Sequence, residues 1–261
     1  MRLALVGASG RMGRAIARLA HADGIEIVCA VGVTDVGRDV GELAGVGPIG
    51  TSVVDGIGAL EHASADVVID FSAPSVTLAL APIAAAGKCA LVSGTTGLTE
   101  EARTALAEAA ERVPVLWEPN MSLGVYALSQ LVAQAVAALG DWDIEIVETH
   151  HRAKIDAPSG TALRLAEAAL RGRAAGMRLV HGRQGKPGAR PADEIGMHAL
   201  RGGDVIGDHT VHLFGGGERI ELTHRATSRD VFAHGALRAA RWIVGKPPRA
   251  YSLGDVLGRR P

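Results

Sequence analysis

The chain has 261 residues, 48% of them hydrophobic, which is enough for one large domain or two moderate domains with a substantial core. The formal net charge is −1 and no block of basic residues is present, which argues against a nucleic-acid partner. Two cysteines in apolar runs, the lack of a membrane-spanning stretch and the lack of a signal-peptide layout predict a cytoplasmic protein with no membrane contact.

Short apolar runs alternate with helical patterns over roughly the first half of the chain. The patterns predict helices after the first strand, at 76–86 and at 100–112. Strands are expected at residues 3–6, 25–31, 67–71, 90–92 and 113–117. Strands and helices of these lengths in alternation indicate a parallel sheet with right-handed crossovers, and hence an α/β domain.

The pattern changes near Asn120, where a long helix at 124–139 is followed by a half-buried strand at 143–147. Strands at 195–200, 208–214 and 219–225, joined by glycine-containing turns, are typical of an antiparallel meander. We therefore expect a second domain of different architecture. The helical tail at 236–244 fits against either domain, and we expect the loop at 185–191 to be mobile.

Gly7, Gly10 and Gly13 follow the first strand directly and open the first helix. Glycine at such a turn lets backbone N–H groups approach a pyrophosphate at the helix N-terminus. The position of the turn favours dinucleotide binding over a tight strand–helix turn with no ligand, and Arg11 within it is a candidate phosphate contact.

The acid that binds the cofactor ribose is expected about 20 residues further on, at the end of the second strand. That strand ends at Val31 and is followed by Gly32 and Val33, so neither an acid nor an arginine stands there. The nearest acid is Asp35, in the loop beyond. The residues therefore do not predict whether the cofactor is NADH or NADPH.

Two later segments follow strands that end at the same predicted edge of the sheet. They are residues 93–97 (SGTTG) and 118–121 (EPNM). Loops at the carboxyl ends of parallel strands bind the ligand in doubly wound sheets, and small or hydroxylated residues suit the nicotinamide half of a cofactor. Ordinary turn chemistry is the alternative for both segments.

The stretch 148–163, ETHHRAKIDAPSGTAL, carries six ionisable residues within nine positions. Folding alone rarely requires such a run, because crowded charges cost desolvation and repulsion. A metal site is disfavoured, since the adjacent His150 and His151 would point to opposite faces of a strand and Lys154 would repel a cation. A nucleophilic Ser159 is disfavoured because no GxSxG turn is present and this serine stands at a helix N-cap position.

The stretch instead favours acid catalysis beside an anion pocket. Histidine side chains in general titrate near neutral pH and can donate a proton, which makes His150 and His151 candidates, and Lys154 can donate one or hold a carboxylate. The turn at 159–161 offers hydroxyls and backbone N–H groups at a helix N-terminus, which favours negative charge. Together with a dinucleotide-binding domain, this predicts reduction of an anionic substrate.

The run EIVETHHRAKIDAPSGTAL closely resembles the signature of the dihydrodipicolinate reductase (4-hydroxy-tetrahydrodipicolinate reductase) family of lysine and diaminopimelate biosynthesis. Further motifs of that family occur in the expected order along nearly the whole chain. They are GASGRMGR, VVIDFSAP, VSGTTG, EPNMSLGV, EIGMHALRGGDVIGDHTV and ELTHRATSRDVFAHGAL.

The resemblance implies a Rossmann-like domain at 1–121, with 230–261 returning to it, and a smaller α+β domain with a mixed or antiparallel sheet at 122–229. It implies reduction of 4-hydroxy-tetrahydrodipicolinate, a small dicarboxylate, with NADH or NADPH as cofactor, by a homotetramer. His150 would be the proton donor and Lys154 a second one. The residues that would contact the substrate are His151, Ser159, Gly160 and Thr161. The residues that would line the cofactor are Gly7, Ala8, Ser9, Gly10, Arg11, Met12, Gly94, Thr95, Thr96, Glu118, Pro119, Asn120 and Met121.

The chain departs from the family pattern at Gly32 and Val33, where family members often carry an acid, sometimes followed by a basic residue. Dual or unusual cofactor use is therefore our hypothesis at this stage. Two other functions compete with the reductase assignment. One is a related dehydrogenase of another small dicarboxylate, which the full-length match of HHRAKIDAPSGT disfavours. The other is a catalytically silent dinucleotide sensor, which the presence of His150 and Lys154 disfavours.

Overall fold

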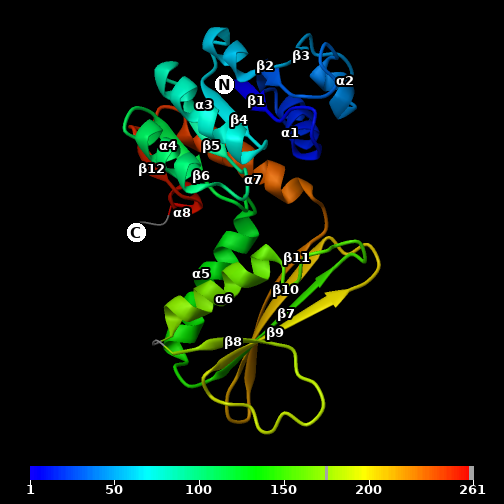
Figure 1. Ribbon diagram of the computed structural model, residues 1–261, viewed down its shortest axis with the longest axis vertical. Helices are drawn as coiled ribbons and strands as arrows, with labels where there is room; N and C mark the ends of the chain where they lie inside the picture. Colours follow the sequence, from blue (N-terminus) through cyan, green and yellow to red (C-terminus); the bar gives the residue numbers. More distant parts are fainter. Residues whose placement is uncertain (174–175, 259–261) are drawn as a thin grey trace. The chain divides into compact units, whose positions relative to one another are not determined.

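The computed structural model describes residues 1–173 and 176–258, and the chain divides into two compact units (Figure 1). The first unit combines Met1–Ser122 with Asp230–Pro261, and the second is Leu123–Arg229. Residues 174–175 of the expected second domain, and 259–261 of the expected returning tail, lie outside the described residues.

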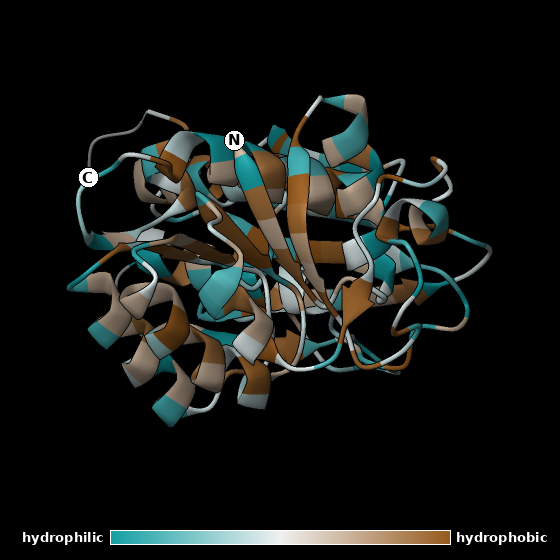
Figure 2. Ribbon diagram, turned by 90° about the horizontal axis from the view of Figure 1, so that it is seen from above, coloured by the Kyte–Doolittle hydropathy of each residue, from teal (hydrophilic) through white to brown (hydrophobic). Residues whose placement is uncertain are grey.

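A parallel sheet forms the centre of the first unit, as the alternating pattern predicts. Its strand order is β12-β6-β5-β4-β1-β2-β3. Short apolar runs become these strands because both faces of a parallel sheet are covered by helices, and the strands beside the N-terminus are largely brown in Figure 2. The strands are β1 (Arg2–Val6), β2 (Glu26–Val31), β3 (Val53–Val54), β4 (Val67–Asp70), β5 (Ala90–Ser93), β6 (Pro114–Trp117) and β12 (Arg249–Tyr251).

Helices α1 and α7 contact each other, whereas α3 contacts α4, and the sheet carries both pairs. Thus α7, from the C-terminal segment, packs beside β4, β5 and β6 of the first unit. The helices are α1 (Arg11–Ala22), α2 (Val40–Ala44), η1 (Ile57–His62, a 3₁₀ helix), α3 (Pro74–Ala86), α4 (Glu100–Ala110), α7 (Asp230–Ile243) and α8 (Leu253–Val256).

The second unit is a mixed sheet covered by two helices. The strand order is β11-β10-β7-β9-β8, in which β7 and β8 run parallel to β9 and β10 runs antiparallel to β7 and β11. Its elements are α5 (Leu123–Ala138), β7 (Asp143–His150), α6 (Gly160–Gly172), β8 (Arg178–His181), β9 (Glu194–Arg201), β10 (Gly207–Phe214) and β11 (Arg219–Ala226).

The predicted antiparallel meander of the last three strands is wrong, because β7 lies between β9 and β10. Ile144 and Ile146 of β7 are fully buried in the core that the sheet forms with α5 and α6, which suits a central strand. The chain after β9 therefore passes the end of β7, where the Gly202 N–H donates to the His150 carbonyl. Strand periodicity identifies a buried face but does not say which strand takes the middle position.

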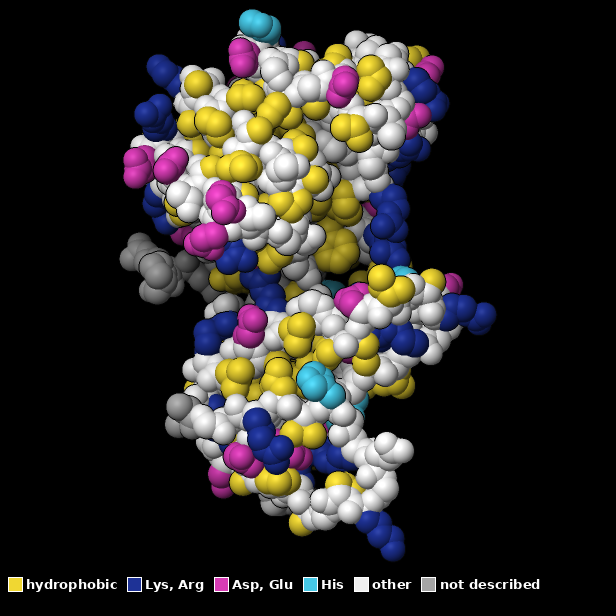
Figure 3. Space-filling model, in the orientation of Figure 1, with side chains coloured by type: hydrophobic (Ala, Val, Ile, Leu, Met, Phe, Trp, Pro, Cys, Tyr) yellow, Lys and Arg dark blue, Asp and Glu magenta, His cyan; other side chains and the backbone are white. Residues whose placement is uncertain are grey.

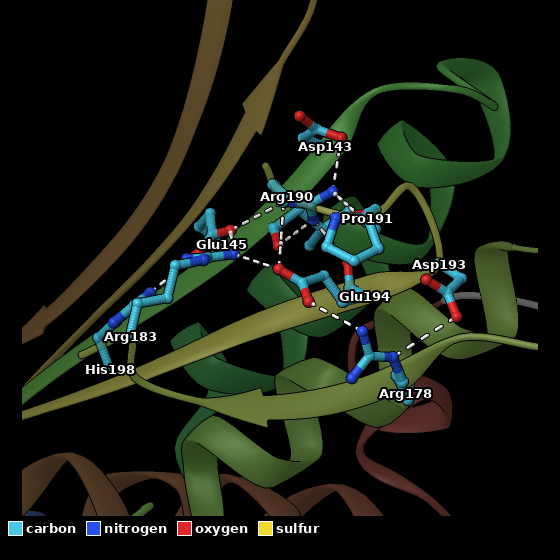
Figure 4. A network of polar contacts seen from close by, with 10 residues as sticks. Asp143, Glu145, Arg178, Arg183, Arg190, Pro191, Asp193, Glu194 and His198 are labelled. Carbon is cyan, nitrogen blue, oxygen red and sulfur yellow. Dashed lines mark hydrogen bonds and ion pairs between the residues drawn. The ribbon is translucent and has the colours of Figure 1, made fainter. Parts of the chain in front are cut away.

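The loop expected to be mobile is anchored at its end by Arg190 (Figure 4). This guanidinium donates to the Asp143 carboxylate at 2.6 Å, to that of Glu145 at 3.0 Å and to the Ile144 carbonyl at 3.2 Å. Burial would raise the pKa of Glu145, but hydrogen bonds from Arg183, His198 and Arg190 lower it to about 2. The ionised carboxylate thus joins the loop to the sheet.

The charged side chains on the face shown in Figure 3 are of both signs and intermingled. None of the helices within the described ranges is both long and apolar enough to cross a lipid bilayer.

Candidate active site

A crevice of about 570 Å³ opens at the carboxyl end of the parallel sheet, beside the glycine turn. Gly7 has φ +81°, and a Cβ there would collide with the Phe71 carbonyl at the end of β4. Glycine therefore lets the turns after β1 and β4 approach each other where the strand order reverses. Gly10 caps the start of α1, so N–H groups of that helix face this edge.

The crevice walls consist mainly of small and apolar residues, which suits a dinucleotide lying against backbone. Of the predicted cofactor residues, Gly7, Ser9 and Gly10 line it, whereas Ala8 is buried. Arg11 is exposed at the first position of α1 and is free of hydrogen bonds and ion pairs to the other described residues, so it is available to a phosphate. Met12, also predicted there, is half-buried on α1.

The residues predicted after β5 differ in exposure, and none of them is part of the crevice lining beside the glycine turn. Thr96 is exposed, but Thr95 is 3% exposed and its hydroxyl donates to Asp70 at 3.0 Å. Gly94 is buried beside the Phe71 ring. The Thr95 side chain therefore fixes the loop and does not line the crevice.

Asp70, which the sequence analysis did not single out, holds two of these loops together. Its buried carboxylate accepts hydrogen bonds from Thr77 at 2.6 Å and from Ser93 at 2.8 Å, as well as from Ser72 and Thr95. The signal was present in the sequence as a lone acid at the end of the apolar run VVID, next to hydroxyl residues in the following turns.

The segment after β6 lies at the same edge of the sheet, although it does not line the crevice beside the glycine turn. Glu118 and Met121 are buried, and Pro119 is exposed. Asn120 accepts the Ser122 N–H through its side-chain oxygen at 2.9 Å, which shapes the turn into the second unit. Any cofactor contact at this segment would therefore involve backbone and the exposed positions.

The charged stretch of the second unit is organised around Glu148, whose role the sequence left open. Glu148 and His150 lie two positions apart on β7, so both side chains point to the side of the sheet that the helices cover. Their exposed fractions are 1% and 8%. Glu148 Oε2 accepts His150 Nδ1 at 2.5 Å. Both carboxylate oxygens bind the Arg201 guanidinium at 2.8 Å, and Oε1 also accepts the Ser159 N–H at 3.1 Å.

These contacts determine the protonation of the pair. Burial would raise the pKa of Glu148, but the hydrogen bonds from Arg201 and His150 outweigh it and lower that pKa. Burial lowers the pKa of His150, Glu148 opposes this shift, and the charges of Lys154 and Arg201 add to it. At neutral pH the imidazole is therefore neutral, with its hydrogen on Nδ1 toward Glu148 and a lone pair on Nε2.

His209, on the neighbouring strand β10, is a second site histidine that the sequence analysis missed. It is 3% exposed, its Nε2 lies 3.0 Å from Ser159 Oγ, and its ring centroid lies 5.1 Å from that of His150, edge to face. Burial, reinforced by the charge of His150, lowers the pKa of His209 to about 4. A neutral His209 therefore supports the serine from inside the unit.

The loop that follows His150 holds the lysine. Lys154 Nζ donates to both carboxylate oxygens of Asp156, at 2.7 and 2.9 Å, and the Asp156 carbonyl accepts Arg201 at 2.6 Å. The hydrogen bond from Lys154 lowers the pKa of Asp156. His151 is half-buried at the start of this loop. Asp156 and Arg201 thus position the lysine, a role the sequence left unassigned.

Helix α6 begins beside these groups. Ser159 is its N-cap, as predicted, and its hydroxyl accepts the Ala162 N–H at 3.2 Å. Gly160 and Thr161 form the first turn, where backbone N–H groups and the helix dipole favour an anion. The second unit therefore gathers His150, Lys154, Ser159, Gly160 and Thr161 near one helix N-terminus, as the motif predicts.

The parallel sheet with its glycine turn, and the histidine–lysine site at a helix N-terminus, define a two-domain dinucleotide-binding oxidoreductase. Residues 1–121 match the family model described as "Dihydrodipicolinate reductase, N-terminus", and residues 124–257 match that described as "Dihydrodipicolinate reductase, C-terminus". The chain belongs to the dihydrodipicolinate reductase family.

Relatives of similar length extend this match. The chain is 51% identical to the 4-hydroxy-tetrahydrodipicolinate reductase of Anaeromyxobacter dehalogenans, covering 99% of this chain and 98% of the relative. It is 48% identical to the enzyme of the same name from Archaeoglobus fulgidus, and the match covers 98% of this chain and 100% of that relative. A dipicolinate-bound dihydrodipicolinate reductase from a Paenisporosarcina species shares the fold, with a TM-score of 0.77 at 23% identity over 97% of both chains.

Proposed function

We propose that this chain reduces 4-hydroxy-tetrahydrodipicolinate to tetrahydrodipicolinate in lysine and diaminopimelate biosynthesis, using NADH or NADPH. The observation that carries the proposal is the buried Glu148–His150 pair beside the N-terminus of α6, in a chain that matches the reductase family over nearly its whole length. The names of the relatives at about half identity support the choice of substrate.

The glycine turn supports a dinucleotide as the reductant. The positive φ of Gly7, the open crevice beside it and the free Arg11 guanidinium fit a pyrophosphate at the start of α1. The bound nicotinamide would supply the hydride. The loops at 94–96 and 118–121 would shape the surroundings of the nicotinamide. Thr95 would contribute by fixing the first of these loops through its hydrogen bond to Asp70.

The proton would come from the second unit. His150 Nδ1 is engaged with Glu148, so Nε2 is the nitrogen that would transfer a proton after the imidazole has been protonated. Glu148 balances the imidazolium that forms, and Lys154, held by Asp156, is the second donor. Reduction would thus consume one hydride and, on balance, one proton, and the 4-hydroxyl group would leave as water.

The substrate carboxylates would be bound at the start of α6. Ser159, Gly160 and Thr161 offer two hydroxyls and the N–H groups of the first helical turn, and His151 begins the adjoining loop. Because Ser159 Oγ is fixed by His209 and the Ala162 N–H, Gly160 and Thr161 would make the closest contacts.

The experiment is a coupled assay that follows nicotinamide absorbance with freshly generated substrate, comparing the wild type with H150Q and K154M. Loss of a general acid should lower kcat by about 100-fold or more while the dissociation constant for the reduced cofactor stays nearly unchanged. H181Q and K186M, which replace exposed residues of the same unit, serve as matched controls. Near-normal kcat in both site variants would refute the proton-donor assignment, and no turnover by the wild type would refute the reaction.

We also propose a homotetrameric, cytoplasmic enzyme, as the family resemblance implies. Helices α5 and α6 cover one face of the second sheet, and the opposite face carries Val147, Leu200 and Phe214, the last two 49% and 37% exposed. These exposed apolar side chains, on a face that they share with Glu145 and His198, support association between copies. Light scattering coupled to size-exclusion chromatography should give four times the chain mass of 26.9 kDa, and a monomer would contradict the assembly.

A further inference from the structure

The end of β2 has no room for the acid that usually binds the cofactor ribose. A Cβ added at Gly32 would lie 2.7 Å from Ser9 Oγ and 3.0 Å from a methyl group of Val53. Ser9 is itself fixed, because its hydroxyl accepts that of Thr34 at 3.0 Å. A side chain at position 32 would therefore require the side chains of Ser9 and Val53 to shift, so the packing here favours glycine.

The nearest acid in the sequence, Asp35, is occupied elsewhere. Its carboxylate binds Arg14 at 2.8 Å and Arg38 at 3.0 Å, and the residue is not part of the crevice lining. Arg14 also donates to the Ser9 carbonyl at 2.9 Å. Asp35 therefore engages the two guanidinium groups that would otherwise be available to a 2′-phosphate.

A different carboxylate lines this part of the crevice. Asp55 follows β3 directly, and β3 pairs in parallel with β2 so that Val54 stands opposite Val31. Asp55 is thus the neighbour of Gly32 one strand further out. It lines the crevice together with Gly32 and Thr34, and its carboxylate has no hydrogen bond or ion pair to the other residues that the structure describes.

We infer that Asp55 replaces the absent acid of β2, accepts the hydroxyl hydrogens of the adenosine ribose and selects NADH over NADPH. A carboxylate accepts hydrogen bonds from a ribose 2′-hydroxyl, whereas it repels a 2′-phosphate at the same place. Arg14 and Arg38 are already paired with Asp35, so a 2′-phosphate would have to compete with that carboxylate for them. This inference rests on the dinucleotide site of the proposed function and specifies its ligand.

Isothermal titration calorimetry with NADH and with NADPH, in the absence of substrate, tests the inference on the full-length protein. The wild type should bind NADH at least about tenfold more tightly than NADPH, the effect of one charge-assisted hydrogen bond. D55N should weaken NADH binding by about tenfold and leave NADPH binding unchanged or tighter. The ratio of the NADPH dissociation constant to the NADH dissociation constant should therefore fall toward one. E61Q removes a charge from an exposed residue of η1 outside the crevice and should keep the wild-type ratio.

The inference fails if D55N weakens both cofactors equally, if it changes neither, or if the wild type prefers NADPH. D55S provides a check on folding, because a correctly folded D55S should show the same collapse of the ratio with an unchanged melting temperature. The outcome is separable from that of the proposed function. A wild type that binds NADH selectively but does not reduce the substrate refutes the reaction alone, and turnover with an unaltered D55N ratio refutes this inference alone.

Discussion

The Glu148 carboxylate accepts the Nδ1 hydrogen of His150 at 2.5 Å, so Nε2 is the ring nitrogen left to exchange a proton with a ligand. Glu148 is in turn fixed by the two hydrogen bonds from Arg201 and by the Ser159 N–H. One buried carboxylate therefore orients the proposed proton donor His150, the end of β9 and the N-cap of the helix that would hold the substrate.

Replacing Glu148 by glutamine tests this coupling. Burial lowers the pKa of His150 and the carboxylate partly opposes that shift, so E148Q should lower the pKa of His150 further. If the imidazolium is the acid, activity falls as the pH rises through that pKa. The pH dependence of kcat/KM in E148Q should therefore move to lower pH, with a loss of about tenfold or more at neutral pH.

Glu145→Gln is the matched control for E148Q. Glu145 lies on the same strand, and its carboxylate is also bound by arginine, but it faces the other side of the sheet. E145Q should lower stability without moving the pH dependence of kcat/KM. If kcat/KM had the same pH dependence in E148Q as in the wild type, Glu148 would not govern the protonation of His150.

Buried His209 predicts a specific loss of stability in acid. Burial lowers its pKa from 6.5 to about 4, so the folded state excludes a proton that the unfolded chain binds below pH 6.5. The stabilisation from neutral His209 is therefore complete above pH 6.5 and is lost as the pH falls toward 4. The full effect is about 3 kcal/mol over that window.

Urea unfolding at several pH values in this window measures the effect. As the pH falls across this window, the free energy of unfolding should decrease less in H209Q than in the wild type. At the high-pH end, H209Q should already have the lower free energy of unfolding, because its contact with Ser159 changes. H181Q, at an exposed position of the same unit, should follow the wild-type slope. Parallel slopes for H209Q and the wild type would contradict the prediction.

Local patterns predicted most of the elements because each strand or helix carries its own burial period. The runs at 67–71 and 124–139 became β4 and α5 with shifts of one residue or so. The order of the second sheet was not predictable, because pairing joins residues far apart in the chain. Glu145, for example, lies opposite both Gly196 and His212.

The site followed the same rule. Contiguous residues such as His150, Lys154 and Ser159 were recognisable because the motif is local. Arg201 and His209 were not, because only the pairing of β9 and β10 with β7 brings them to Glu148 and Ser159. Asp55 was missed for the same reason, since its place beside Gly32 depends on the register of β3 with β2.

Arg190 is predicted to fix the loop between β8 and β9. R190A removes bonds to Asp143, Glu145 and the Ile144 carbonyl, so the loop should open more often while the sheet stays folded. Limited trypsin digestion should cut R190A after Arg183, a basic residue of this loop that no proline follows, at least about fivefold faster than the wild type. R225A, a change on β11 with one ion pair to Asp208, is the control. Equal cleavage rates in all three proteins would show that Arg190 does not restrain the loop.

Asp70 is predicted to stabilise the first unit and to shape its cofactor loops at the same time. Its fully buried carboxylate accepts four hydroxyl groups, and D70A would leave those hydroxyls without their acceptor. The free energy of unfolding should fall by about 3 kcal/mol, and reduced-cofactor binding should weaken because Ser72 and Thr95 lose their common anchor.

D70N keeps the shape and one acceptor oxygen, so it should lie between D70A and the wild type in both measurements. D66A is the control, because Asp66 is an exposed acid just before β4 whose carboxylate accepts the Arg2 N–H. If D70A cost no more stability than D66A and bound the cofactor normally, Asp70 would not be the anchor of these loops.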